Sequence, residues 1–242
     1  MKFHVYKNKE TLCEELALWM IDIINSTLHS QEFFTLALSG GETPKLLFKK
    51  LASEEFKEKI NWKRIHIFWG DERVVPFNDK RNNAGNAYEL LINHINIPAA
   101  QIHKMRTDIE PVFAANAYEK ILHTYFDNTN KSFDLILLGM GDDGHTLSLF
   151  PGSPIIEENT NWVNEVYNQE QHMYRLTLMP EIVNRASHVA FMISGSGKAE
   201  VLKKVIEEKF MPSILPAQLI KPKNDELHLF LDEDAAKEIV IP

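Results

Sequence analysis

An aspartate and a histidine stand two residues apart in a glycine-rich segment, LLGMGDDGHTLSLFPG, at residues 137–152. A carboxylate that holds one imidazole nitrogen leaves the other nitrogen as a base that works near neutral pH. The spacing of Asp143 and His145 therefore favours proton-transfer chemistry. A single histidine after a strand is more often structural, so these two residues alone leave a structural role as the alternative.

The same segment contains the pattern G-x-G-x-x-G, formed by Gly139, Gly141 and Gly144 after an apolar run. This pattern is typical of dinucleotide-binding loops, in which a long helix starts near the last glycine and its free N–H groups face the pyrophosphate. Pro151 follows too soon for such a helix, and the two aspartates before Gly144 would repel the phosphates. We therefore expect a loop that does chemistry itself, with no bound cofactor.

A second polar segment, ALSGGETPKLLF, is typical of a phosphate-binding turn. Its glycines, Gly40 and Gly41, let the backbone approach a ligand, and the free N–H groups at the start of the following helix can bind phosphate. Ser39 and Thr43 add hydroxyl groups on either side. Two points count against this hypothesis. Glu42 weakens a phosphate site unless its side chain points away, and a tight turn with Thr43 as the N-cap would explain the same residues.

Three cationic side chains are candidates for binding an anion. Lys198 lies at a glycine-flanked helix start in SGSGKAE, which is not a Walker loop because Ala199 stands where Ser or Thr must hold magnesium. Arg73 directly follows a predicted strand in FWGDERVVP, and Arg175 lies within the predicted strand MYRLTL. An arginine can bind carboxylate or phosphate, or stabilise developing negative charge. The alternatives are a solvated lysine and a local salt bridge of Arg73 with the two acids before it.

The composition limits the remaining function classes. Lys and Arg number 26 against 34 Asp and Glu, a net charge of −8, which gives no support to a nucleic-acid partner. The single cysteine excludes an intrachain disulfide, and no two of the ten histidines have the three- or four-residue spacing of a helical metal motif, so we expect no metal centre. No leader-like segment or apolar run of membrane-spanning length occurs, so we expect a cytoplasmic protein without a membrane partner.

Strand-like and helix-like segments alternate along the chain. The predicted strands are FHVY, FFTLALS, RIHIFWG, FDLILLGM, MYRLTL, HVAFMIS and ELHLFL. The helical patterns between them are KETLCEELALWMIDIINSTL, TPKLLFKKLASEEF, GNAYELLINHI, VFAANAYEKILHTYF and GKAEVLKKVIEE. Continuously apolar strands are typical of a parallel sheet covered on both faces. The alternation predicts one α/β domain over residues 1–242, with three α/β/α layers and a mainly parallel sheet.

The polar loops of this predicted fold share one position relative to the sheet. SGGETP, GDERVVP, GMGDDGHT and SGSGKAE each follow a predicted strand. Ligands of open α/β sheets bind beyond the carboxyl ends of the strands. We therefore expect these four loops to converge on one crevice.

Taken together, the loops resemble those of the 6-phosphogluconolactonases, within a superfamily that also includes glucosamine-6-phosphate isomerases and deaminases. The segments that carry the resemblance are LSGGETP, FWGDERVVP, the pair Asn82-Asn83, LLGMGDDGHTLSLFPGSP, YRLTLMPEIVNRA, SGSGKAEVL and LPAQLI. They run in the family's order over about residues 9 to 236. The resemblance implies a Rossmann-like fold, no obligatory cofactor, and hydrolysis of 6-phospho-D-glucono-1,5-lactone to 6-phospho-D-gluconate, a step of the oxidative pentose phosphate pathway.

The isomerase and deaminase branch of the superfamily is the main alternative. That branch typically has tyrosine where this chain has Arg73, and an acid five residues after the loop histidine, where this chain has Phe150. Isomerisation and deamination need that additional proton-handling group, so both positions favour the lactonase. Glu42 and Asn82 replace serines of the commonest lactonase pattern, and the first replacement puts a side-chain phosphate contact at position 42 in doubt.

The resemblance and the loops together predict a division of roles. We expect His145, oriented by Asp143, to remove a proton from water, while Arg73 or Arg175 stabilises the oxyanion. The residues expected to bind the substrate or its phosphate are Ser39, Gly40, Gly41, Thr43, Lys198, Arg175, Asp71 and Asn83. The expected partner is a small phosphosugar lactone, and the expected assembly a monomer or small homo-oligomer. A sugar-phosphate-binding module without turnover is the third hypothesis.

Overall fold

A six-stranded sheet lies at the centre of the computed structural model, which describes residues 1–158 and 160–240. Its strand order is β1-β9-β8-β5-β2-β3, and every neighbouring pair is parallel. The strands of this main sheet are β1 (Lys2–Tyr6), β2 (Phe34–Leu38), β3 (Ile65–Trp69), β5 (Leu135–Leu138), β8 (His188–Ile193) and β9 (Leu227–Asp232). The predicted α/β class with a mainly parallel sheet is confirmed.

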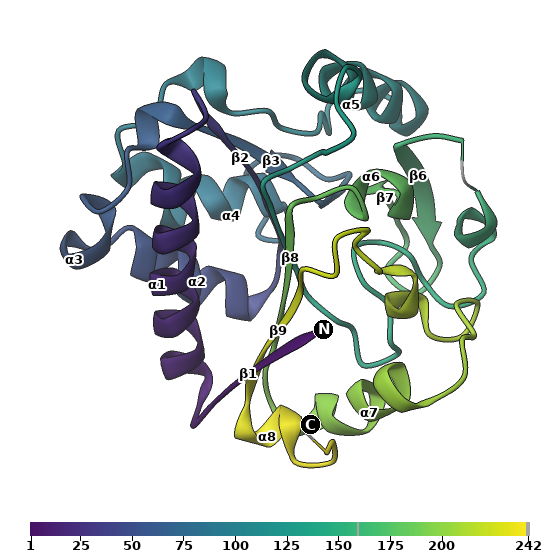
Figure 1. Cartoon of the computed structure of the whole chain (residues 1–242). Coiled ribbons are helices and arrows are strands. Elements are labelled where there is room, and N and C mark those ends of the chain that lie inside the picture. Colours follow the sequence, from purple (N-terminus) through teal and green to yellow (C-terminus); the bar gives the residue numbers. More distant parts are fainter. Residues whose placement is uncertain (159, 241–242) are drawn as a thin grey trace.

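Helices cover both faces of the main sheet. They are α1 (Lys9–Leu28), α2 (Glu42–Leu51), α3 (Glu54–Lys57), α4 (Asn83–Leu90), α5 (Pro111–Phe126), α6 (Pro180–Val183), α7 (Ala199–Glu207) and α8 (Glu233–Ala236). Figure 1 shows α1, α2 and α4 on one side of the sheet and α5, α6 and α7 on the other. Two buried apolar clusters fill the spaces between these layers, one under each set of helices. The architecture therefore has the three layers that the alternating pattern predicts.

Helix α1 illustrates how the sequence pattern fixes an element. Its N-cap residue, Asn8, accepts the backbone N–H of Thr11 at 2.9 Å, which satisfies one of the free donors at the helix start. Leu12, Leu16 and Ile24 recur at helical spacing and are fully buried against the sheet. Burying each such side chain stabilises the fold by about 1.5–3 kcal/mol. Among the described residues, no helix is both long enough and apolar enough to cross a membrane.

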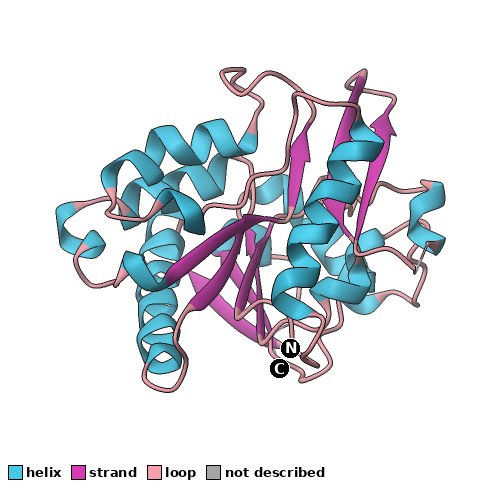
Figure 2. Ribbon diagram, turned by 90° about the horizontal axis from the view of Figure 1, so that it is seen from above, coloured by secondary structure: helices cyan, strands magenta, loops and turns pink. Residues whose placement is uncertain are grey.

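A second, antiparallel sheet contains the segment predicted as the strand MYRLTL. That segment forms β7 (Met173–Leu178), which lies between β4 (Asp71–Arg73) and β6 (Val163–Asn168) in the order β4-β7-β6. Figure 2 shows this small sheet as a separate group of strands beside the main sheet. β4 and β6 were not predicted, because β4 has only three residues, all charged, and β6 is half polar. The prediction that residues 71–73 form a loop is therefore wrong.

A polar cluster between β3 and α5 makes one histidine sensitive to pH. His66 Nδ1 lies 3.1 Å from His103 Nε2, and the hydroxyl of Tyr125 lies 2.9 Å and 3.0 Å from these two nitrogens. The ring of His103 also stacks on Phe68, with centroids 4.5 Å apart. Burial, helped by the neighbouring His66, lowers the pKa of His103 from 6.5 to about 4. The folded chain therefore holds this imidazole neutral.

We expect this cluster to weaken the fold in acid. Above about pH 6.5 His103 is neutral in both the folded and the unfolded chain. Below this pH, His103 of the unfolded chain is protonated first, because its pKa is higher there. The free energy of unfolding should therefore fall as pH drops from about 6.5 to about 4, and fall less in His103→Gln. Urea unfolding at both ends of this range measures the difference. The exposed His94→Gln is the control, and equal losses in wild type and His103→Gln would contradict the account.

Candidate functional site

Loops from β2, β3 and β5 meet at the carboxyl edge of the main sheet, beside the small sheet. They enclose a cavity of about 120 Å³. Its lining residues are Ser39, Gly40, Asp71, Arg73, Gly139, Met140, Gly141, His145, Leu147 and Arg175. Six of the predicted site residues are in this set. Of the four loops expected to converge, those after β2 and β5 line the cavity, GDERVVP contributes strand β4, and SGSGKAE contributes no lining residue.

Asp143 holds the imidazole of His145 at one side of the cavity. The His145 Nδ1 lies 2.5 Å from the Oδ1 of Asp143, and the same oxygen accepts the backbone N–H of His145 at 3.1 Å. Partial burial opposes ionisation of Asp143, but the hydrogen bond and the charge of His145 outweigh it and lower the pKa of this carboxyl. Because Asp143 occupies Nδ1, the Nε2 of His145 is the nitrogen left for a substrate or water.

The loop leaves no room for a side chain at Gly141. A Cβ on Gly141 would lie 2.1 Å from His145 Nδ1 and 2.6 Å from Asp143 Oδ1. The N–H of Gly141 also donates to the carbonyl of His145 at 2.8 Å, which closes the loop. Leu147 has a φ of 55°, an uncommon value outside glycine. Gly141 therefore lets the loop close around the Asp143–His145 pair.

A buried ion pair also lines the cavity. Arg175 is 3% exposed, and its Nη2 lies 3.4 Å from the Oδ2 of Asp71. Ser148 bridges the pair, since its hydroxyl donates to Asp71 at 2.8 Å and accepts from Arg175 Nε at 3.1 Å. Gln171 accepts a further hydrogen bond at 3.1 Å. Burial lowers the pKa of Arg175 to about 10 although Asp71 opposes this effect, so the side chain stays cationic at neutral pH.

Arg73 brings a second guanidinium to the cavity. Arg73 and Arg175 are direct partners across the β4–β7 ladder, so their side chains project from the same face of the small sheet. Arg73 Nη1 donates to the carbonyl of Arg81 at 2.9 Å, whereas its buried Nε has no hydrogen-bond partner in the described part of the chain. Two adjacent guanidinium groups, one with a free donor, favour an anionic ligand or transition state.

The predicted phosphate turn keeps its backbone open. Gly41 is the N-cap of α2 with a φ of 115°, so Thr43 is not the cap that the alternative interpretation required. Thr43 instead contacts the hydroxyl of Ser194, with 3.1 Å between the oxygens. The carboxylate of Glu42 binds Lys45 at 2.7 Å, which draws it into a local ion pair. The backbone N–H groups at this helix start are therefore not blocked by a capping side chain.

Five predicted residues lie outside the cavity lining, namely Gly41, Thr43, Asp143, Lys198 and Asn83. Lys198, at the end of a short 3₁₀ turn, forms an ion pair at 2.5 Å with Asp142, which lies on the loop of Asp143 and His145. Asn83 is buried, and its Nδ2 donates to the carbonyl oxygen of Asp71 at 2.9 Å. A Cβ on Gly40 would lie 1.9 Å from Asn83 Oδ1, so Asn83 packs closely against the turn at Gly40 and does not line the cavity.

Sequence reasoning missed two buried residues that hold the site. Ser148 was not a candidate, because a serine in SLF carries no signal for its bridging role. Glu72 accepts three backbone N–H bonds of 2.7–2.8 Å, from Arg73 and from Asn83 and Ala84 at the start of α4. Burial nevertheless raises the pKa of Glu72 to about 7. The carboxylate of Glu72 accepts the backbone N–H of Arg73, and Asp71 forms its ion pair with Arg175. The alternative of a local salt bridge between Arg73 and the two acids before it is therefore wrong.

Comparison with known proteins identifies the family. A model of the glucosamine-6-phosphate isomerase/6-phosphogluconolactonase family matches residues 7–229. The chain belongs to this family. It is 38% identical over 202 residues to a 6-phosphogluconolactonase of Haemophilus influenzae, covering 84% of this chain and 86% of the relative. It is 36% identical over 236 residues to a 6-phosphogluconolactonase of Synechocystis sp., covering 96% and 95%.

Solved structures agree with this assignment. The crystal structure of a protein named devB superposes with a TM-score of 0.91 at 32% sequence identity, covering 99% of each chain. The chain and this solved structure therefore share one fold, a Rossmann-like α/β arrangement with a mainly parallel sheet.

We expect the Asp71–Arg175 pair to be essential to the stability of this family member. Asp71→Asn leaves a buried guanidinium without its carboxylate, since both side chains are less than a tenth exposed. Breaking such a pair costs about 3 kcal/mol or more, which urea unfolding measures. The double variant Asp71→Asn/Arg175→Met should recover part of the loss, because it removes the unpaired charge. A loss below about 0.5 kcal/mol in Asp71→Asn would contradict this role.

Proposed function

We propose that the chain hydrolyses 6-phospho-D-glucono-1,5-lactone to 6-phospho-D-gluconate, with His145 as the general base. The observation that carries this proposal is the 2.5 Å contact between His145 Nδ1 and Asp143 beside a cavity that two arginines also line. This set supplies the parts that lactone hydrolysis needs, namely one oriented base and a cation for the oxyanion. The 6-phosphogluconolactonase names of the relatives support the same substrate.

The chemistry follows from these positions. The Nε2 of His145 takes a proton as the oxygen of water bonds to the lactone carbonyl carbon. The carbonyl oxygen becomes negative and is stabilised by a guanidinium. The bond to the ring oxygen then breaks, and this oxygen takes the proton from the imidazolium, while the new carboxylic acid loses its proton to solvent. Asp143 keeps the ring oriented throughout and stabilises its cationic form.

The two arginines have different freedom to act. Arg175 is fixed by Asp71, Ser148 and Gln171, whereas the Nε of Arg73 has no hydrogen-bond partner among the described residues. We assign the oxyanion contact to Arg73 on this basis. Arg175 supplies positive potential from a fixed position and contacts the sugar hydroxyls or phosphate.

The phosphate belongs at the start of α2. The free N–H groups from Gly40 to Thr43 favour an anion there, and Ser39 and Thr43 add hydroxyl donors. Lys198 supports the same group by exchanging its partner Asp142 for the phosphate. No cofactor takes part in this scheme. We place the reaction in the cytoplasm, with the chain acting as a monomer or small homo-oligomer.

The position of Phe150 favours the lactonase over the isomerase or deaminase. Its ring centroid lies 4.8 Å from that of His145, beside the catalytic base. A phenyl ring neither donates nor accepts the second proton that isomerisation and deamination require. A binding module without turnover would not need the close Asp143–His145 pair, so the same contact favours an enzyme.

The role of His145 predicts a large loss of turnover in His145→Ala. Removing a general base costs about 10²–10⁴-fold in kcat, and Asp143→Asn should fall between this variant and wild type. The assay follows freshly prepared lactone with 6-phosphogluconate dehydrogenase as the coupling enzyme, after subtraction of the uncatalysed rate. The exposed His94→Ala is the matched control. A folded His145→Ala protein with nearly wild-type kcat would refute the assignment.

The role of Lys198 predicts a change in KM. Lys198→Met should raise KM about tenfold or more, because a hydrogen bond to a charged group contributes about 1.5–3 kcal/mol. The change in kcat should be small, since the contact is equal in the ground and transition states. Asp142→Asn, which frees the lysine, should leave KM unchanged or lower it. If Lys198 only anchors Asp142, both variants will instead raise KM alike.

A further inference from the structure

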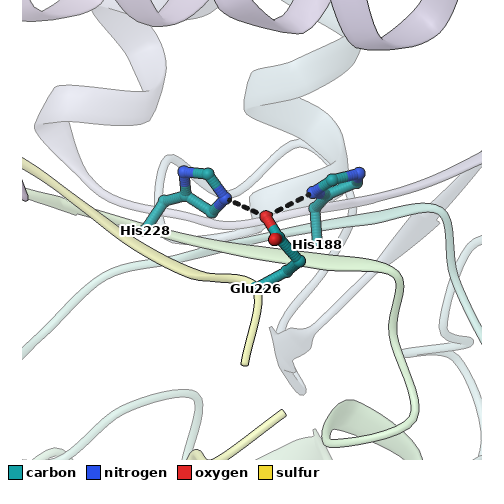
Figure 3. A group of neighbouring side chains, drawn as sticks. All are labelled: His188, Glu226 and His228. Carbon is teal, nitrogen blue, oxygen red and sulfur yellow. Dashed lines mark hydrogen bonds and ion pairs between the residues drawn. The ribbon is translucent and has the colours of Figure 1, made fainter. Parts of the chain in front are cut away.

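Two histidines and a glutamate gather at the edge of the main sheet opposite to the cavity. His188 is the first residue of β8, and His228 is the second residue of the neighbouring strand β9, directly after Glu226 and Leu227. They therefore lie at the amino ends of the strands, whereas the cavity lies at the carboxyl ends. Figure 3 shows the ring nitrogens of both histidines pointing at the carboxylate of Glu226.

The ligand atoms of these side chains are already close to a metal-binding arrangement. His228 Nε2 lies 2.9 Å and His188 Nδ1 lies 3.6 Å from the Oε2 of Glu226, and the three ligand atoms lie within 4.8 Å of one another. A tetrahedral zinc ion, with bonds of about 2.0–2.2 Å, holds its ligand atoms roughly 3.4 Å apart. Small rotations of the side chains would therefore place all three atoms around one ion.

One nitrogen of the cluster is left without a hydrogen bond. His188 Nδ1 is buried and has no hydrogen-bond partner among the described residues, although it points at a carboxylate. Buried ring nitrogens normally have a partner. We propose that His188 Nδ1, Glu226 Oε2 and His228 Nε2 bind a divalent transition-metal ion of the zinc class.

The surroundings of His228 provide the outer contact that a metal-binding histidine needs. The Nδ1 of His228 lies 3.0 Å from the Nε2 of His4 on the adjacent strand β1. When Nε2 of His228 binds the ion, Nδ1 carries the proton and donates a hydrogen bond to Nε2 of His4, which fixes the ring. The ring centroid of Trp19 in α1 lies 4.6 Å from that of His228 and 5.9 Å from that of His188, so Trp19 covers the cluster.

Lys2 competes with the ion for the same carboxylate. Its ammonium lies 2.7 Å from both oxygens of Glu226, and its side chain is 51% exposed. Without metal, Lys2 neutralises Glu226. With metal bound at Oε2, the lysine can keep Oε1 or move into solvent. The side chains of His188 and Glu226 are 27% and 29% exposed, so water can reach the fourth position of the ion. Because its ligands come from β8, from β9 and from the residue directly before β9, the bound ion would stabilise this edge of the fold.

The test uses tag-free, chelator-stripped full-length chain, titrated with Zn²⁺ by calorimetry and with Co²⁺ by its visible absorption. We expect one equivalent of Zn²⁺, tetrahedral Co²⁺ bands, and a rise in Tm on binding. His188→Ala and Glu226→Gln should each weaken binding by roughly 100-fold, since each removes one of three ligands. Lys2→Met should tighten binding roughly two- to fivefold, because it removes a competing charge.

The control separates this cluster from the other imidazole–carboxylate pairs. His145→Ala should bind Zn²⁺ as wild type does, because the catalytic loop is not part of the cluster. Binding that survives both His188→Ala and Glu226→Gln would overturn the proposal. The proposal would also be overturned if the folded double variant His188→Ala/Glu226→Gln bound Zn²⁺ as tightly as the wild-type chain.

Discussion

Gly70 is the residue at which the chain passes from the main sheet into the small one, and the cavity depends on this passage. Its N–H donates to the carbonyl of Leu38 in β2 at 2.9 Å, and its own carbonyl accepts from Leu178 in β7 at 2.8 Å. A Cβ at this position would lie 2.7 Å from the side chain of Leu147. Glycine therefore lets both sheets approach the loop of Asp143, His145 and Leu147 at once. The guanidinium groups of the small sheet reach the cavity because this junction is tight.

The arrangement of charge would let an acidic chain bind the proposed anionic substrate. The net charge is −8, but the cavity collects Arg73 and Arg175 on one face of the small sheet. One carboxylate, Asp71, balances the more buried guanidinium and leaves the other available. Local placement of charge, rather than its total, thus decides the class of ligand.

The sequence predicted the parts of the site that depend on neighbours along the chain. Asp143 and His145 are two residues apart, and the parallel strands needed only their apolar runs to be found. The position of Arg175 beside the cavity depends on the pairing of β7 with β4. These two strands are far apart in the sequence, so the sequence alone could not place Arg175 in a second sheet. The roles of Ser148 and Glu72 were not predicted for the same reason. Ser148 acts through its contact with Asp71, and Glu72 through its contacts with the start of α4. The prediction of no metal centre considered only helical spacing, whereas His188 and His228 meet across two strands.

The reaction itself needs a direct test, because the family includes both lactonases and isomerases. The decisive measurement compares the wild-type chain on two substrates, fresh 6-phosphogluconolactone and glucosamine 6-phosphate. The account predicts hydrolysis of the lactone well above its uncatalysed rate and no conversion of the amino sugar. A folded chain that leaves the lactone at its spontaneous rate, or that deaminates glucosamine 6-phosphate, would contradict it.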